Sequence, residues 1–431
     1  MLTDGRPRAS RSIVALLASS FLSVTAALVA TTALGKLVYD ITRSELALGL
    51  LGLAEFAPAA VLVLVTGPVA DRYDRRTVAA LGIGVEALAA LGLIALVATG
   101  PKTALPIFAF VLVFGVGRAF ANPAARSLPA DIVDADRLPW LTARYTATWQ
   151  TAMIAGPVLG GMLYAIDETA PFMAMFALLI VAALSVRLVR VERTVPAADL
   201  PAARTALEPI AEAVSGIPPE PPERAGLHEA MAGLRFIRNQ PVLLGAISLD
   251  LFAVLFGGAV ALLPAIAEER LHVDAVAYGW LRAAGGIGAA LVTIALARRP
   301  LTRRVGPTLL CVVALFGVGT IVLGVTRSYV VAFLAMIVLS GADAVSVFVR
   351  ATLVPLVTPD DKRGRVLAVE NVFIGASNEL GAFESGVAGQ AIGPAGAVVL
   401  GGVATLAIAV GWWVLFPALR KVDRFPDAPP R

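Results

Sequence analysis

Long unbroken runs of apolar residues make up most of this chain, and short polar stretches separate them. An α-helix needs about 20 apolar residues to cross the hydrocarbon core of a bilayer. Twelve runs are long enough: Ser12–Val38, Ala47–Thr66, Thr77–Thr99, Ala104–Ala125, Leu138–Ala165, Pro171–Val191, Pro241–Ala267, Ala277–Ala297, Gly306–Val325, Tyr329–Pro355, Arg365–Ala391 and Gly396–Leu415. Because apolar and polar positions do not alternate within them, the runs predict spanning helices rather than strands of a barrel.

One long polar stretch, Glu192 to Gln240, separates the sixth run from the seventh. It is rich in proline, which cannot extend a helix and favours an open linker. The pattern predicts a six-helix bundle over 1–191, a cytoplasmic proline-rich linker over 192–240, and a second six-helix bundle with a cytoplasmic tail over 241–431. The end of the linker, Leu227–Arg238, is predicted to form a short amphipathic helix on the membrane surface.

Composition supports an all-α membrane protein. Of the 431 residues 58% are hydrophobic and only 15% are charged, too few charges to cover a soluble protein of this length. The single cysteine excludes an intramolecular disulfide, and with two histidines the chain lacks a Cys/His cluster for metal or catalysis. We therefore expect no cofactor and no metal. A membrane enzyme or sensor is the alternative class, but no nucleophile–base constellation or phosphate loop indicates one.

The placement of positive charge predicts the orientation. If both termini are cytoplasmic, the opposite side of the membrane carries few basic residues, namely Lys36, Arg43, Lys102, Arg270 and Arg327. Most of the other lysines and arginines then lie in cytoplasmic segments, as the positive-inside rule requires. This asymmetry explains the net charge of +4 without a nucleic-acid partner. The apolar run after the basic start is too long for a signal peptide, so we expect a multi-pass protein of a bacterial inner membrane.

The two halves show a weak internal repeat. A shift of the chain by one half aligns Gly117 with Gly341 and Arg126 with Arg350. Both copies fall at the end of the fourth run of a half. Such a repeat is typical of a duplicated transporter that binds its substrate between the halves.

The connection after the second run carries a compact charged motif. A glycine at a helix end permits close helix approach, and an acid near the next helix start complements its positive end. The motif comprises Gly67, Asp71, Arg72, Arg75 and Arg76. It resembles the pattern G-x-x-x-D-R-x-G-R-R of the major facilitator superfamily, with Asp74 at the usual glycine. The resemblance implies a fold of two pseudo-symmetric six-helix bundles and a conformational gate in this loop. The alternative is an ordinary basic loop.

The fifth run contains a glycine–proline motif. Gly156, Pro157, Gly160 and Gly161 combine a close-packing G-x-x-x-G groove with a residue that kinks the helix. The motif is similar to the G-x-x-x-G-P-x-x-G-G signature of exporters and antiporters of the superfamily, although Ala152 replaces its first glycine. The resemblance implies efflux. Plain helix packing is the alternative reading.

Several charged residues lie inside predicted spans, where charge is costly unless it is paired or faces water. Arg118 matches an arginine of the superfamily's exporters, which implies proton coupling or anion binding; a structural pair to a carboxylate is the alternative. A membrane-embedded carboxylate can take up and release a proton, as an antiporter requires. The candidates for substrate binding or proton coupling are Arg118, Asp343, Glu379, Asp250, Glu384 and Glu55. We expect Glu86 to be peripheral and structural.

The eleventh run is unusually polar and must face the cavity or the other half. With the loop motif, it makes the chain similar to the branch of the superfamily that contains siderophore and macrolide exporters and lysophospholipid transporters. The resemblance implies a monomeric, proton-driven exporter of a small amphiphilic molecule. Its partners would be the substrate, protons and membrane lipids. The alternative is a lysophospholipid flippase that uses no proton gradient.

Overall fold

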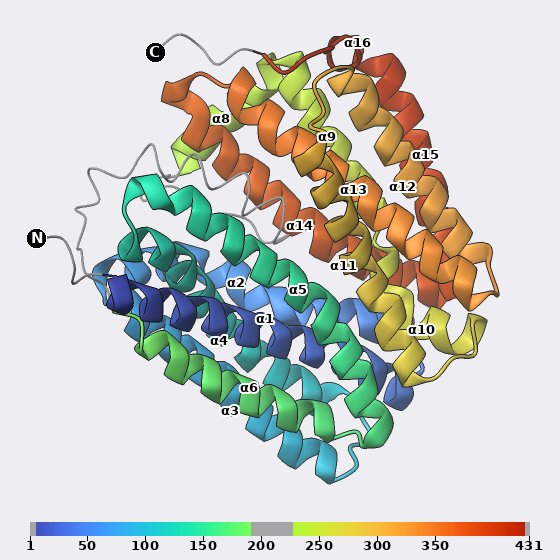
Figure 1. Ribbon diagram of the computed structural model, residues 1–431. Helices are drawn as coiled ribbons and strands as arrows, with labels where there is room; N and C mark the ends of the chain where they lie inside the picture. Colours follow the sequence, from blue (N-terminus) through green and yellow to red (C-terminus); the bar gives the residue numbers. More distant parts are fainter. Residues whose placement is uncertain (1–5, 191–226, 427–431) are drawn as a thin grey trace, which may run out of the picture. The chain divides into compact units, whose positions relative to one another are not determined.

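A computed structural model of the chain describes residues 6–190 and 227–426, and within them the regular structure is entirely helical (Figure 1). The predicted linker residues 192–226 lie outside the described part. Long helices fall on the predicted spans: α1 (Arg6–Thr42), α2 (Glu45–Arg72), α3 (Arg75–Ala98), α4 (Leu105–Ile132), α5 (Leu138–Ile166), α6 (Ala170–Arg187), α9 (Pro241–Phe256), α11 (Ala275–Arg298), α12 (Val305–Val325), α13 (Tyr329–Val357), α14 (Asp360–Ile392) and α15 (Pro394–Leu415). The short helices α8 (Leu227–Asn239) and α16 (Pro417–Arg420) adjoin them.

The seventh span is broken, whereas the sequence predicted a continuous helix over Pro241–Ala267. Helix α9 ends at Phe256, and a 3-10 turn (Ala259–Leu262), α10 (Leu263–Ala265) and a π turn (Ile266–Arg270) follow. The break falls at the pair Gly257–Gly258. Gly258 lies so close to the backbone of Gly381 on α14 that a Cβ would collide with it, an approach that only glycine allows.

Two of the predicted spans differ from the others in polarity. Ten helical segments of the described residues are long and apolar enough to cross a membrane. Helices α5 and α14 are not among them, although they have 29 and 33 residues and are long enough. Helix α14 carries buried polar side chains, including Glu370, Asn371 and Ser377. Since lipid cannot satisfy such groups, these helix faces must pack against protein.

The first of two compact units comprises residues 1–42, 54–211 and 275–283, so far as they are described. In it α3 packs against α4 and α6, and α1 packs against α5 and α6 (Figure 1). Small residues bring the helices together. Ala26, Ala30 and Ala33 of α1 are fully buried, and Gly160 of α5 lies against the backbone of Val29.

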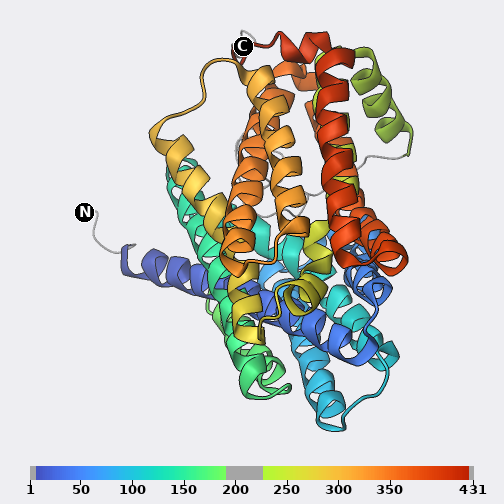
Figure 2. The ribbon, with the colours of Figure 1, turned by 90° about the vertical axis from the view of Figure 1, so that its right-hand side faces the viewer.

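The second unit comprises residues 43–53, 212–274 and 284–431, again as far as they are described. In it α12 packs against both α13 and α15, and α9 packs against α14 and α15 (Figures 1 and 2). The first turns of α2 belong here, because Gly49 lies against the backbone of Phe383 on α14. The division into halves at residues 191 and 241 stays a prediction.

The predicted amphipathic helix is present as α8, which packs in the second unit on α14 and α9. Ile237 is buried in an apolar cluster with Leu243 and Val366. The ammonium of Lys362 lies 4.7 Å from the ring centroid of Phe236. Helix α8 therefore belongs to the folded second unit.

Candidate functional site

An ion pair joins two helices in the first unit. The guanidinium Nη1 of Arg118 on α4 lies 2.5 Å from the carboxylate Oε1 of Glu55 on α2. The same guanidinium lies 5.6 Å from the ring centroid of Phe114. About a quarter of each charged side chain is exposed. The structure thus pairs two of the candidates, and the alternative reading of Arg118 as a partner of a carboxylate describes this contact.

A second carboxylate belongs to this cluster. Glu86 of α3 is 3% exposed, so the expectation that it is peripheral was wrong. Its charge interacts with those of Arg118 and Glu55. Gly117 of α4 makes the approach possible, because a Cβ there would meet the backbone and side chain of Glu86. Glu86 is therefore close enough to the ion pair of Arg118 and Glu55 to interact with it electrostatically.

A similar but more deeply buried cluster lies in the second unit. Arg350 of α13 places Nη2 2.8 Å from Oδ1 of Asp250 on α9. Its Nη1 lies 4.0 Å from Oε1 of Glu370 on α14. All three residues are at most 5% exposed. Removing one partner from such a buried network leaves an uncompensated charge, which is strongly destabilising.

Asp343 lies beside this cluster. Asp250 and Asp343 line one pocket together with Ser346, and apolar residues of α9, α12 and α13 form the rest of its wall: Ala253, Val254, Val312, Val313, Phe316 and Ala342. The structure therefore brings two further candidates together, from α9 and α13. A narrow apolar pocket with two carboxylates strongly favours a positively charged occupant.

The two remaining candidates lie on α14. The carboxylate of Glu379 lies beside Gly52 in the first turns of α2, at 3.1 Å from where a Cβ would stand. Glu384 is partly buried. Within the described part of the chain it forms no hydrogen bond or ion pair. Glu384 therefore has no contact among the described residues that assigns it a role.

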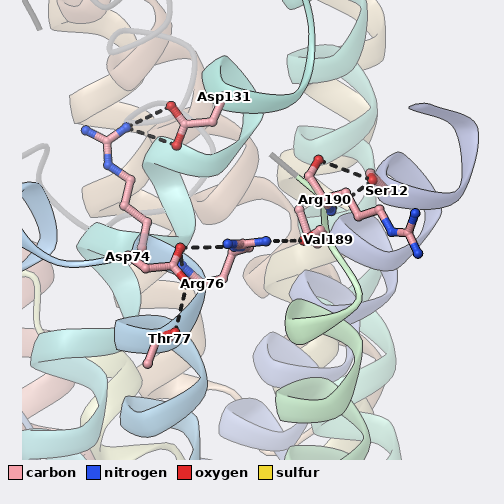
Figure 3. A network of polar contacts seen from close by, with 8 residues as sticks. Ser12, Asp74, Arg76, Thr77, Asp131, Val189 and Arg190 are labelled. Atoms are coloured by element: carbon pink, nitrogen blue, oxygen red, sulfur yellow. Dashed lines mark hydrogen bonds and ion pairs between the residues drawn. The ribbon is translucent and has the colours of Figure 1, made fainter. Parts of the chain in front are cut away.

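The loop motif after α2 forms a polar network (Figure 3). Arg75 reaches across to α4, where its Nη1 lies 2.9 and 3.1 Å from the two carboxylate oxygens of Asp131. Nε of Arg76 donates to Asp74 at 3.0 Å, and its Nη1 donates to the carbonyl of Val189 at 3.2 Å. The motif thus ties the start of α3 to the ends of α4 and α6.

Asp74 replaces the usual glycine without strain. Its φ of −58° is one that any residue adopts, and its carboxylate caps α3 by accepting from the Arg76 backbone NH and from the Thr77 hydroxyl. Gly67 and Arg72 lie in the last turns of α2, and Arg72 is exposed. The side chain of Asp71 lies outside the described part of the structure.

Replacing Asp74 by alanine is expected to lower the free energy of unfolding by about 0.5–2 kcal/mol, because it removes the N-cap of α3. Partial burial acts to raise the pKa of Asp74, but the hydrogen bonds from Arg76 and Thr77 and the charge of Arg76 outweigh it and lower the pKa. The ionised carboxylate therefore stabilises the fold above its unfolded pKa of about 3.9, and this contribution disappears as the pH falls through the lower folded value.

Thermal unfolding of the detergent-solubilised protein at neutral and acidic pH tests this prediction. Asp74→Ser keeps a capping oxygen and serves as the control. A loss of stability that is equal for the alanine and serine variants, or that does not shrink in acid, would contradict the capping role.

The glycine–proline motif of α5 lies in two packing contacts of the first unit. A Cβ on Gly156 would meet the side chain of Leu28, and one on Gly160 would meet the backbone of Val29, both on α1. Gly161 faces the other way, against Gly279 in the first turns of α11. The motif therefore packs α5 closely between two helices.

In the structure, five residues that were not candidates from the sequence lie in the charged clusters, the pocket or the packing contacts of the glycine–proline motif: Glu86, Arg350, Glu370, Ser346 and Gly279. A signal existed for Arg350, since an arginine inside a span predicts a nearby carboxylate. Which carboxylates these are depends on how the helices are rotated. In uniformly apolar helices, periodicity resolves that rotation poorly.

Comparison with known proteins places the chain in a family. The sequence model of the Major Facilitator Superfamily matches residues 13–349. The enterobactin exporter EntS of Escherichia coli O1:K1 is 25% identical over 371 residues, which cover 86% of this chain and 82% of that protein. EntS of Citrobacter koseri is likewise 25% identical over 85% of this chain and 82% of its own length.

Solved structures share the fold. A bacterial homologue of the human lysosomal transporter Spinster, in an inward-facing and unoccupied conformation, matches with a TM-score of 0.69 at 15% identity, covering 96% of this chain and 97% of that one. A bacterial homologue of the iron transporter ferroportin matches with a TM-score of 0.64 at 14% identity, covering 96% and 98%. Because the family match spans well over half of the sequence, this chain is a multi-pass membrane transporter that belongs to the Major Facilitator Superfamily.

Proposed function

We propose that this transporter exports a small amphiphilic molecule by proton antiport with alternating access. The observation that carries the proposal is the presence, inside each unit, of an arginine within a long helix that is paired with carboxylates of neighbouring helices: Arg118 with Glu55 in one unit, and Arg350 with Asp250 and Glu370 in the other. Carboxylates embedded in a membrane cost free energy, and they usually mark functional sites. Reversible protonation of such a group is the chemistry that a proton-coupled carrier requires.

The direction of transport is supported by similarity. The curated relatives described above are enterobactin exporters, and the similarity extends over most of both chains. The glycine–proline motif of α5, which resembles the exporter signature of the superfamily, occupies a close helix contact at Gly156 and Gly160. These observations support export rather than uptake of the substrate.

Alternating access gives the loop motif a role. In this proposal the two bundles rock about a central substrate site, and the loop with Gly67, Asp71 and Arg72 latches one of the end states. Arg75 and Arg76 are already held by Asp131 and Val189. They would keep the loop rigid, and the proposal assigns the latch itself to Asp71 and Arg72.

The proposed setting is a bacterial inner membrane, with both termini and the linker in the cytoplasm. The unequal distribution of basic residues between the two sets of connections supports this orientation. The proposal includes a monomer, because the internal repeat predicts that one chain supplies both bundles.

Transport by purified protein in liposomes tests the proposal. The liposomes contain a pH-sensitive dye, and amphiphilic compounds of different charge are added one at a time. We expect at least one compound to cause proton movement that depends on the protein, and an imposed proton gradient to drive accumulation of that compound. If a carboxylate couples proton movement to transport, its change to the amide should abolish both the proton movement and the gradient-driven accumulation of the compound.

Two results would contradict the proposal. Binding of several compounds without any proton movement would exclude antiport. Protein-dependent transfer of a fluorescent lysophospholipid between leaflets, unaffected by an uncoupler, would instead support the lipid-flippase alternative. Liposomes containing only detergent-treated lipid provide the baseline for both assays.

A further inference from the structure

A polar stripe runs along one face of α13 in the second unit. Asp343, Ser346 and Arg350 are separated by three and four residues, a spacing that places side chains on the same face of a helix. This face is directed toward α9, since Arg350 pairs there with Asp250 and the pocket of Asp343 is shared with Asp250. Helix α9 breaks at Phe256, close beyond this pocket, and broken spans in transporters often border ion sites.

The carboxylates around the stripe are not equivalent. Asp250 and Glu370 both lie within 4.0 Å of the guanidinium of Arg350. Asp343, in contrast, forms no hydrogen bond or ion pair within the described residues, although it lines the pocket. Its carboxylate is therefore the one that is left without a fixed counter-charge.

Ser346 provides an independent sign of an occupant. The residue is 3% exposed and lines the pocket, yet its hydroxyl has no hydrogen-bond partner within the described residues. Buried hydroxyls in helices commonly bond to the carbonyl one turn earlier, as Thr352 does to Phe348 at 2.9 Å. The hydroxyl of Ser346 is thus available to a group inside the pocket.

Charge and size together define that occupant. The cluster holds Asp250, Asp343 and Glu370 against the single guanidinium of Arg350, whereas the residues that α12 contributes to the pocket are apolar. The excess negative charge demands a cation. The pocket has room for about one water molecule, too little for an organic cation. A proton satisfies both conditions.

We propose that Asp343 carries the coupling proton, with Ser346 as its hydrogen-bond partner. Arg350 is a positioning residue, because it holds Asp250 and Glu370 and leaves Asp343 as the group that changes charge. Uptake forms one O–H bond on the Asp343 carboxylate, and release breaks that bond and returns the proton to water. The formal charge of the four groups alternates between −1 and −2. This inference rests on the proposed antiport and names the group that performs it.

The test compares two reactions of reconstituted protein, using the compound that moves protons in the wild type. Counterflow exchanges labelled for unlabelled compound without net proton movement, whereas coupled transport requires proton release. Asp343→Asn is expected to reduce coupled proton release about 10-fold or more while counterflow stays within about 2-fold of wild type. Asp167→Asn, which changes an exposed carboxylate between α5 and α6, is the matched control and should leave both reactions unchanged.

Two further variants test the neighbours of Asp343. Ser346→Ala should shift the pH at which proton release is half-maximal. Ser377→Ala, a buried serine whose hydroxyl already bonds to the carbonyl of Ile374, should not. Arg350→Lys should keep coupled release with a changed pH profile, and Arg350→Gln should lose it. The lysine variant keeps this test informative if the glutamine variant does not fold.

The outcomes separate this inference from the proposed function. If no compound moves protons in the wild type, the antiport itself is wrong. If the wild type moves protons and Asp343→Asn does so equally, the antiport stands and the assignment of Asp343 is overturned. Loss of counterflow in Asp343→Asn would also overturn it, because Asp343 would then belong to the substrate site.

Discussion

Arg118→Gln is expected to slow transport by about 10- to 100-fold, which corresponds to a rise of about 1.4–2.8 kcal/mol in the activation free energy of transport. The substitution removes the ion-pair partner of Glu55 and the positive charge that acts on the buried Glu86. Breaking a buried ion pair by removing one partner lowers the stability of a protein by about 3–5 kcal/mol. We expect a smaller loss of stability here, because about a quarter of the Arg118 and Glu55 side chains is exposed and solvent screens exposed pairs.

Removing the carboxylate of Glu55 instead of the guanidinium should have a smaller effect on the transport rate. In Glu55→Gln the guanidinium of Arg118 keeps its electrostatic interaction with the buried Glu86, so transport should fall only a few-fold. A double-mutant cycle between the two positions would measure their coupling, which for contacting residues is typically about 0.5–3 kcal/mol.

Arg282→Gln is a suitable control, since it also removes an arginine inside a predicted span. The only hydrogen bond of Arg282 within the described residues joins its Nη1 to the hydroxyl of Tyr278 at 3.5 Å. Transport rates should be compared at equal amounts of folded protein, as judged by size-exclusion profile and unfolding temperature. Equal losses in Arg118→Gln and Arg282→Gln would show that the cluster of Arg118 has no special role.

Gly160→Ala is expected to destabilise the first unit by about 1–3 kcal/mol, the typical cost of overpacking a close contact. The new Cβ would lie 2.9 Å from the carbonyl oxygen and 3.2 Å from the Cα of Val29. Backbone atoms cannot rotate away as a side chain can, so α1 and α5 must separate. The unfolding temperature should fall by several degrees, since about 1 kcal/mol shifts it by about 2–4 °C in units of this size.

Gly84→Ala makes the same chemical change where it meets no obstacle. Gly84 lies on α3, and nothing stands within 4 Å of the position of its Cβ. Because alanine favours the helix by up to about 1 kcal/mol relative to glycine, this variant should be as stable as wild type or more so. If both variants change stability in the same direction, helix propensity rather than close packing decides the effect.

The helical architecture was largely predictable from the sequence, because one strong physical constraint acts on it. Backbone polar groups cannot stay unsatisfied in lipid, so every long apolar run must be a helix. The exception was the seventh span. Its apolar run continues through Gly257 and Gly258, and the break there depends on the backbone of Gly381, which lies more than one hundred residues further along the chain.

The charged residues were predictable as individual groups but not as clusters. Arg118, Glu55, Asp250 and Asp343 stood out because charge inside a span is rare. Their partners did not, and Glu86 was misjudged as peripheral although it is 3% exposed. Helix α3 is apolar on all sides, so its sequence contains no polar face from which the rotation of Glu86 could be inferred.

By itself the sequence determined the helices, their order and the family, since these follow from the length of the apolar runs and from short local motifs. Only the tertiary structure decided which charges meet. The pairing of Arg350 with Asp250 and Glu370, and the hydroxyl of Ser346 left open to the pocket of Asp343, depend on the rotation and approach of α9, α13 and α14. That rotation is set by the packing of many small side chains between helices. Because this packing involves residues that are far apart in the chain, it cannot be predicted from any short stretch of sequence.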